Sequence, residues 1–184
     1  GPLPHGPVPF PAPEHIELEE ERNNGAPPLV RVRFTGPRKE RAETPNPGSI
    51  RAFALLEHMH GFLEGPGLWA GTGCSHRAAL LRLDPDGSQA QVASYVEDIG
   101  RHNCLDRLAG HAALTGLVPG EHALLTTARL TASLYAKARR LGVTFMVSRA
   151  AITRVALREA PKAGIALVGF CRPAEKRLTV FSDP

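Results

Sequence analysis

The sequence lacks long apolar runs, has few cysteines and carries only a small excess of one charge sign. No run approaches the roughly 20 consecutive apolar residues that span a bilayer, and no signal peptide is visible. Lys and Arg total 22 against 18 Asp and Glu, so the net charge of +4 is too small to indicate nucleic-acid binding. Three cysteines without evident pairing indicate a reducing compartment. We therefore expect a cytoplasmic protein that binds neither a membrane nor a nucleic acid.

Motifs for several common chemistries are also absent. The zinc deaminases need His-x-Glu followed by Pro-Cys-x-x-Cys, but His76-Arg77-Ala78 has no glutamate and no Cys-x-x-Cys occurs. We therefore expect no metal site. The glycine-rich segment 71–76 is neither a Walker loop nor a GxGxxG fingerprint, and no Gly-x-Ser-x-Gly elbow supports a serine hydrolase.

Strand and helix patterns alternate from residue 49 to the end of the chain. The spacing of apolar residues predicts helices at Ser49–Glu64, Asn103–Leu114, Leu130–Leu141 and Ile152–Ala160. It predicts strands at Ala78–Leu83, Gln89–Val96, Ala123–Thr127, Val143–Ser148, Ile165–Phe170 and Leu178–Phe181. An antiparallel hairpin followed by such alternation predicts an α/β fold, with helices on the faces of a mixed, largely parallel sheet.

The first 48 residues have a different composition. Residues 1–28 are rich in Pro and Gly and include the acidic stretch Glu17–Glu21, which predicts an extended arm. Leu29–Thr35 alternates apolar and basic residues like a half-buried strand, and 36–49 carries three prolines and reads as a loop. We therefore divide the chain into an arm with a partial strand region, 1–48, and an α/β domain, 49–184.

The sequence also predicts details of the region after residue 48. In the first helix, Ser49 is predicted as the N-cap, and one stripe is formed by Phe53, Leu56, His60 and Leu63. Gly142 suits the left-handed position that ends the third helix. Trp69, the single tryptophan, is assigned a packing role.

The densest polar block of the chain is 97–107, Glu-Asp-Ile-Gly-Arg-His-Asn-Cys-Leu-Asp-Arg, between a predicted strand and a predicted helix. Ligands of α/β folds bind at the carboxyl ends of strands, where segments 71–76, 98–106, 126–131 and 170–177 are expected to meet. Arg side chains and helix-start amides there suit phosphate oxygens. The alternative is that Arg101, Asp98 and Asp106 only tie loops together as ion pairs.

The three cysteines are open to more than one interpretation. Cys104, in the first turn of a predicted helix beside two arginines, is either a thiol with a lowered pKa or a small buried residue of the core. Cys171 follows an apolar strand and is placed in the same cleft, and Cys74, in the glycine-rich loop, is expected to be the most exposed. None has a base near it in the sequence that would identify a nucleophile.

Four segments together resemble one family, the formate dehydrogenase accessory sulfurtransferases (FdhD). Segment 71–80 resembles its Thr-Gly-Gly-x-His-x-Ala-Ala motif, and 97–106 is similar to its Glu-Asp-Val-Gly-Arg-His-Asn-x-x-Asp signature. Segment 136–148 resembles the helix and strand that follow, and 167–173 matches its Leu-x-Gly-Phe-x-Lys/Arg end. The resemblance covers about residues 48–184, and the second motif is the most specific.

The resemblance implies a three-layer α/β/α fold of cytidine-deaminase type without the catalytic zinc. It implies a homodimeric sulfurtransferase that takes sulfur from a cysteine desulfurase as a persulfide. The sulfur passes to the bis-molybdopterin guanine dinucleotide form of the molybdenum cofactor, which GDP mimics, before its insertion into formate dehydrogenase. The cofactor-binding stretch of the family carries over onto Phe170, Cys171, Arg172, Pro173, Ala174 and Glu175, and Arg101 and His102 are added from the polar block.

The chain departs from the family at its transfer residue. The persulfide cysteine of the family lies in a Cys-Gly-x-Cys-Gly loop that corresponds to 36–49, where this sequence has no cysteine. The family's Ser-Gly-Arg becomes Thr127-Ala128-Arg129, and its following glutamate is Leu134. Either the gene encodes a cysteine loop that this stretch lacks, or the chain is a divergent binding protein for guanine nucleotide or the cofactor that has lost transfer. The catalytic residue is therefore not assigned.

Overall fold

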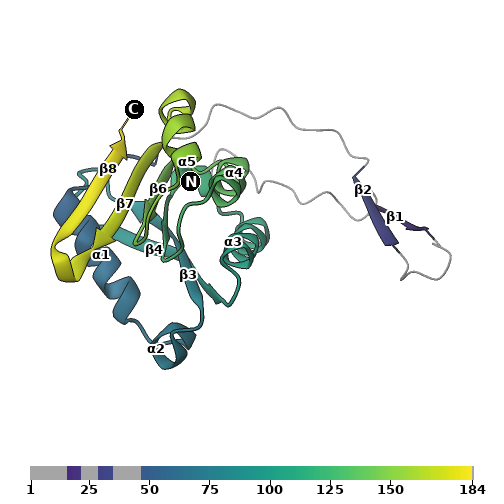
Figure 1. Cartoon of the computed structure of the whole chain (residues 1–184), viewed down its shortest axis with the longest axis horizontal. Helices are drawn as coiled ribbons and strands as arrows, with labels where there is room; N and C mark the ends of the chain where they lie inside the picture. Colours follow the sequence, from purple (N-terminus) through teal and green to yellow (C-terminus); the bar gives the residue numbers. More distant parts are fainter. Residues whose placement is uncertain (1–15, 22–28, 35–46, 184) are drawn as a thin grey trace.

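The computed structural model describes residues 16–21, 29–34 and 47–183. Within these ranges the chain forms eight strands and five α-helices (Figure 1). The strands are β1 (Ile16–Glu21), β2 (Leu29–Phe34), β3 (His76–Leu83), β4 (Ala90–Asp98), β5 (Ala123–Thr126), β6 (Phe145–Ser148), β7 (Ala166–Arg172) and β8 (Arg177–Ser182). The helices are α1 (Ala52–Glu64), α2 (Leu68–Thr72), α3 (Arg101–Thr115), α4 (Ala132–Arg140) and α5 (Arg154–Glu159).

Strands β3 to β8 form one mixed sheet in the order β4-β3-β5-β6-β7-β8, and β1 and β2 pair separately as an antiparallel hairpin. Strands β5, β6 and β7 are parallel, whereas the β3–β4 hairpin and β8 run antiparallel to their neighbours. The carboxyl ends of β4, β5, β6 and β7 therefore meet the amino ends of β3 and β8 at the same end of the sheet. This arrangement confirms the predicted mixed α/β sheet and the predicted meeting of the four polar segments. The expectation of a largely parallel sheet is wrong, because three of the five strand pairings are antiparallel.

The sheet is covered on both faces. One core joins α3, α4 and α5 to alternate strand residues such as Leu124, and the other joins α1 to the residues between them, such as Leu125. Because both faces are buried, β5 is buried at all four of its positions and reads as a continuous apolar run. The end of the sheet is thus the place where polar side chains of several elements remain accessible.

Helix α1 differs from its predicted form. It begins at Ala52, and its N-cap Arg51 makes no side-chain cap bond, so Ser49 is not the N-cap. The buried stripe is Leu55, Met59 and Phe62, whereas Phe53 is 71% exposed and His60 is exposed. The observed stripe is apolar at every position, and the predicted one, offset by one residue, would have placed the polar ring of His60 in the core.

The remaining boundaries shift by a few residues. Helix α3 begins two residues earlier than predicted, so Arg101 and His102 form its first turn. Gly142 has the expected left-handed φ of 93°, and β2 matches its predicted strand. Strand β1, its pairing with β2, and the short helix α2 were not predicted. The arm outside β1 and β2, and the loop up to residue 46, lie outside the described residues, so the division at residue 48 stays a prediction.

Candidate functional site

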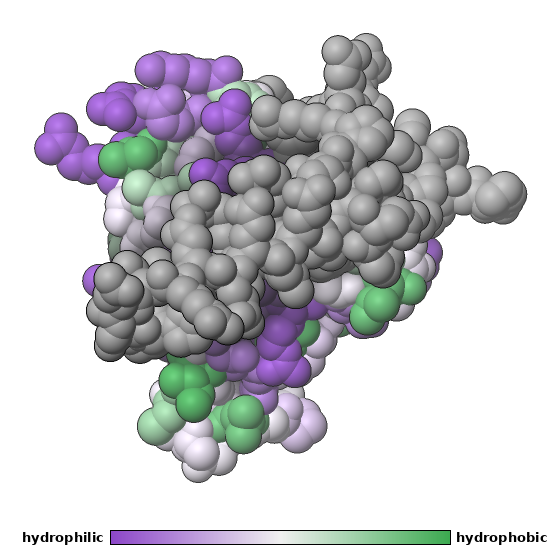
Figure 2. Space-filling model, turned by 90° about the vertical axis from the view of Figure 1, so that its right-hand side faces the viewer, coloured by the Kyte–Doolittle hydropathy of each residue, from purple (hydrophilic) through white to green (hydrophobic). Residues whose placement is uncertain are grey.

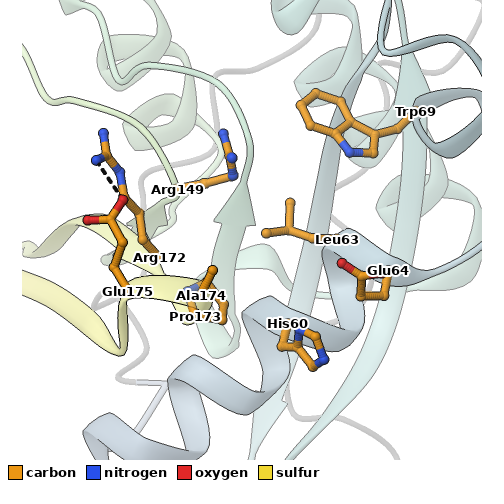
Figure 3. A pocket seen from close by; sticks show the side chains of 9 residues that line it. All are labelled: His60, Leu63, Glu64, Trp69, Arg149, Arg172, Pro173, Ala174 and Glu175. Carbon is orange, nitrogen blue, oxygen red and sulfur yellow. Dashed lines mark hydrogen bonds and ion pairs between the residues drawn. The ribbon is translucent and has the colours of Figure 1, made fainter.

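A pocket of about 240 Å³ opens at the end of the sheet where the polar segments meet (Figure 3). Its lining comes from α1, α2, the loop after β6 and the turn between β7 and β8, and consists of His60, Leu63, Glu64, Trp69, Arg149, Arg172, Pro173, Ala174 and Glu175. Its volume is below the roughly 300–1,000 Å³ usual for drug-sized ligands. The pocket therefore fits one part of a large ligand, such as a phosphate group or a single base.

One side of the pocket is basic. Figure 3 shows Arg149 and Arg172 on the same side, with Arg172 joined to Glu175 at 3.0 Å. Glu175 also pairs with Arg177 at 2.7 Å, and the guanidinium of Arg172 lies 5.2 Å from the centre of the Phe170 ring. Exposed ion pairs such as these contribute about 0–1 kcal/mol. An anionic ligand could therefore compete with Glu175 for Arg172.

Arg149 is held by the backbone around it. The residue before it, Ser148, is fully buried, and its hydroxyl donates to the carbonyl of Ala128 at 2.7 Å and accepts from the amide of Ala150 at 2.9 Å. The amide of Arg149 itself donates to the carbonyl of Thr126 at 3.0 Å. The backbone of Arg149 is thus fixed at the carboxyl end of β6, while its side chain is exposed.

The opposite side of the pocket combines apolar, aromatic and acidic groups. The last turns of α1 provide His60, Leu63 and Glu64, and α2 provides Trp69 (Figure 3). Leu63 and Trp69 are half-buried, whereas His60 and Glu64 are exposed. This side offers an indole surface for stacking and a carboxylate, and the facing side offers two guanidinium groups, so one small cavity combines stacking with polar contacts.

A buried ion pair supports the side of the pocket that α1 and α2 form. Arg77 has no exposed surface, and its Nε donates to Oε1 of Glu97 at 2.5 Å. Its other nitrogens donate to the carbonyls of Phe62, Leu63 and Gly65 at 2.7, 2.9 and 2.7 Å, at the carboxyl end of α1. The guanidinium therefore satisfies carbonyls that the helix leaves without partners.

Glu97 extends the same network to α2. Its carboxylate accepts the amides of Leu68 at 2.5 Å and Trp69 at 3.3 Å, the first two residues of that helix. Burial raises the pKa of Glu97, but hydrogen bonds from Tyr95, Arg77 and these amides outweigh burial and hold the pKa below its usual range. Glu97 is therefore a charged carboxylate at neutral pH.

The structure gathers four of the eight predicted ligand-binding residues in the pocket: Arg172, Pro173, Ala174 and Glu175. The other four do not line it. Phe170 is half-buried, with its ring 6.3 Å from that of Phe181. The Cys171 side chain is fully buried in the core beneath α1, which corrects its predicted place in the cleft. Strand alternation and the backbone bulge before Arg172 turn this thiol away from the pocket.

Arg101 and His102 lie at the amino end of α3, outside the pocket lining. Nε2 of His102 is 3.4 Å from Oγ of Ser133, and Nε of Arg101 is buried without a hydrogen-bond partner among the described residues. The ion-pair interpretation holds for the two aspartates, because Asp98 lies 3.6 Å from Arg107 and Asp106 lies 2.6 Å from a lysine of α4. No ion pair of Arg101 is found in the described part of the chain.

The cysteines separate clearly by exposure. Cys104 is 1% exposed, and burial together with the charge of Asp98 raises the pKa of its thiol to about 11. The lowered pKa considered for Cys104 is therefore wrong, and its interpretation as a small core residue is confirmed. Burial raises the pKa of Cys171 to about 12, whereas Cys74 is exposed, as predicted.

Five pocket residues were missed by the sequence reasoning. Arg149 directly follows a predicted strand, so the rule that placed the other segments at strand ends also applies to it. His60 and Leu63 were assigned to the helix stripe and Trp69 to packing, and Glu64 was treated as the end of a helix. No pattern in the sequence indicates that these four residues face a shared cavity, because segment 65–67, which joins their two helices, has no periodicity.

The described residues contain neither a candidate metal site nor a helix that could span a membrane. No group of three or more His, Cys, Asp or Glu side chains there is placed to hold a metal ion. No helix in the same ranges is long and apolar enough to cross a membrane.

Residues 27–184 match the family model of the FdhD/NarQ family. The chain belongs to this family. The match includes the hairpin that provides Arg172 and Glu175, and the block at Glu97 that supports the opposite side of the pocket.

Relatives in the family are named as sulfur carriers. The chain is 36% identical over 136 residues to the sulfur carrier protein FdhD of Wolinella succinogenes, which covers 74% of this chain and 46% of the relative. It is 32% identical over 131 residues to the protein of the same name from Bacillus subtilis, which covers 71% of this chain and 47% of the relative. The chain thus spans about half the length of these relatives.

A solved structure is also similar. It is the crystal structure of a formate dehydrogenase accessory protein from Desulfotalea psychrophila, with a TM-score of 0.66 and 26% identity. The similarity covers 95% of this chain and 72% of that protein. The mixed sheet described above is therefore a fold found in a formate dehydrogenase accessory protein.

Proposed function

We propose that this FdhD-family chain binds the guanine nucleotide portion of the bis-molybdopterin form of the molybdenum cofactor and acts as its sulfur carrier during the maturation of formate dehydrogenase. The observation that carries the proposal is the position of Arg172–Glu175. These residues, which match the cofactor-binding stretch of the family, border the same pocket as Arg149 and Trp69. The cofactor is cargo in this proposal, received for sulfuration and handed on.

The pocket residues suit that cargo in charge and size. The phosphates would contact Arg149 and Arg172 through charge-assisted hydrogen bonds, and the base would lie against Trp69. A cavity of about 240 Å³ does not hold the whole cofactor, so the rest would extend along the end of the sheet. Arg101 and His102, at the same end but outside the pocket, are proposed to contact that remainder.

The finer assignments of the resemblance are proposed together with this function. The six-stranded sheet with helices on both faces is proposed to be of cytidine-deaminase type, with no catalytic zinc. The sulfur donor is proposed to be a cysteine desulfurase, the recipient enzyme formate dehydrogenase, and the active form a homodimer. The support for each is membership of the family.

Calorimetric titration with GDP tests the binding half of the proposal. Arg172→Ala should weaken GDP binding by about 1–2 kcal/mol, because a charge-assisted contact is lost at a partly exposed position. Arg158→Ala removes the same charge from α5, where Arg158 is 67% exposed and pairs only with its neighbour Glu159 among the described residues. That control should bind GDP like the wild type. Absence of GDP binding by the wild type would contradict the proposal.

A second function, binding without transfer, is favoured by one observation: segment 36–49 has no cysteine. Intact-protein mass spectrometry after incubation with a cysteine desulfurase and cysteine separates the two functions. A stable increase by the mass of one sulfur atom supports transfer. GDP binding without such an increase supports a binding protein for the nucleotide or the cofactor.

A further inference from the structure

Helix α2 is too short and too exposed to be stable on its own. It has five residues, and none of them is buried. Leu68 is 56% exposed, and Figure 2 shows hydrophobic side chains at the lower end of the molecule, the level at which α2 lies in Figure 1. A helix of this length is not stable by itself in water. Its position must therefore come from contacts with the rest of the fold.

The best-defined of these contacts is the carboxylate of Glu97. It accepts hydrogen bonds from the amides of Leu68 and Trp69, which otherwise have no partner within so short a helix. The backbone of Gly67 lies so close to Glu97 that a Cβ on Gly67 would clash with its carboxylate. Gly67 also has a φ of 146°, a value that L side chains rarely adopt.

The carboxylate of Glu97 is itself held in place by Arg77. Arg77 binds Glu97 and the last carbonyls of α1, so one buried cation connects the end of α1 with the start of α2. The ring of Tyr95 lies 5.9 Å from the guanidinium carbon of Arg77 and packs against Phe62 with centroids 5.9 Å apart. Every charged group of the pair is thus satisfied, which makes the arrangement rigid.

We propose that Glu97, held by Arg77, is a positioning residue that places Trp69 in the wall of the pocket. The expected effect of Glu97 on ligand binding rests on the proposed function, whereas the placement of Trp69 by Glu97 does not. The same pair orients the end of α1, which carries Leu63 and Glu64. One buried ion pair thereby sets the geometry of the whole side of the pocket that faces Arg149.

The experiment uses Trp69 as the probe, because it is the only tryptophan of the chain. Acrylamide quenching of its fluorescence and calorimetric titration with GDP are measured on folded protein. Glu97→Gln should raise the quenching constant and shift the emission to longer wavelength. It should weaken GDP binding about three- to tenfold, the loss expected for one aromatic contact.

A second variant leaves the buried pair intact. Leu68→Pro removes one of the two amides that donate to Glu97, together with an exposed side chain, at the first helical position, where proline is tolerated. Its effects on quenching and GDP affinity should follow the direction of Glu97→Gln. Ala132→Pro is the matched control: it is also exposed and first in its helix, after an N-cap with an extended ψ of 165°, but outside the pocket. It should change neither quantity.

Wild-type quenching and wild-type GDP affinity in folded Leu68→Pro and Glu97→Gln would overturn the inference, even if both variants melt at lower temperature. Lower thermal stability alone would assign Glu97 a structural role. Failure of the wild type to bind GDP would refute the proposed function, and the quenching comparison would still decide whether Glu97 positions Trp69.

Discussion

Cys74 should be the only thiol of the native protein that reacts quickly with a thiol reagent. The other two are 1% and 0% exposed, and the pKa values of Cys104 and Cys171 are raised to about 11 and about 12. At pH 8 roughly one Cys104 thiol in a thousand, and one Cys171 thiol in ten thousand, would be ionised even in the folded state. Since the thiolate is the nucleophile, both should react slowly until the core opens.

Titration with Ellman's reagent measures this difference. Native protein at pH 8 should release one equivalent of chromophore in a fast phase, and protein unfolded in guanidinium chloride should release three, the full cysteine content. Cys74→Ser should remove the fast phase and leave the slow one. A fast phase larger than one equivalent, or one that survives in Cys74→Ser, would refute the assignment of the buried thiols. Any persulfide formed by a desulfurase on the folded chain is likewise expected on Cys74.

Three further predictions concern stability. Gly169→Ala should destabilise the fold by about 1–3 kcal/mol in urea unfolding, because its Cβ would lie 2.8 Å from the ring of Phe181 and 3.0 Å from Ile152. Ser148→Ala should cost about 1–3 kcal/mol in the same assay, because it leaves buried backbone groups without partners. The pKa of Glu97 is lower in the folded protein than in the unfolded chain. Its ionised carboxylate therefore stabilises the fold at pH values above the unfolded pKa, and this stabilisation is lost as the pH falls through the folded pKa. The difference in unfolding free energy between wild type and Glu97→Gln should therefore narrow below about pH 4.

The elements that the sequence predicts best are those with the strongest periodicity. The buried strands β5, β6 and β7 appear in the sequence as short apolar runs, and their alternation with helices was enough to predict the mixed sheet. Helix α1 shows where periodicity fails. Two overlapping stripes, one through Leu56 and one through Leu55, have the same helical spacing. The second packs against the sheet, and it avoids the burial of His60 that the first would require.

The pocket could be predicted only on its basic side. Arg172 and Glu175 follow a strand and match a known motif, so both local pattern and resemblance identify them. Trp69 lies on a helix of five residues whose position depends on an acceptor 28 residues away in sequence. A contact of that kind leaves no periodic trace in the chain, because it depends on how the start of α2 meets the end of β4 rather than on which residues recur.

The position of Glu97 also changes how the polar block 97–107 is understood. Its density of charge at a strand end first suggested ligand contacts, yet its aspartates form ion pairs with neighbouring cations, and Glu97 faces inward to Arg77. A ligand contact at Glu97 would need a free carboxylate, whereas this one already accepts from Arg77, Leu68 and Trp69. The segment that most clearly places the chain in its family therefore supports the pocket from behind, and the residues that face the cavity come from four shorter segments around it.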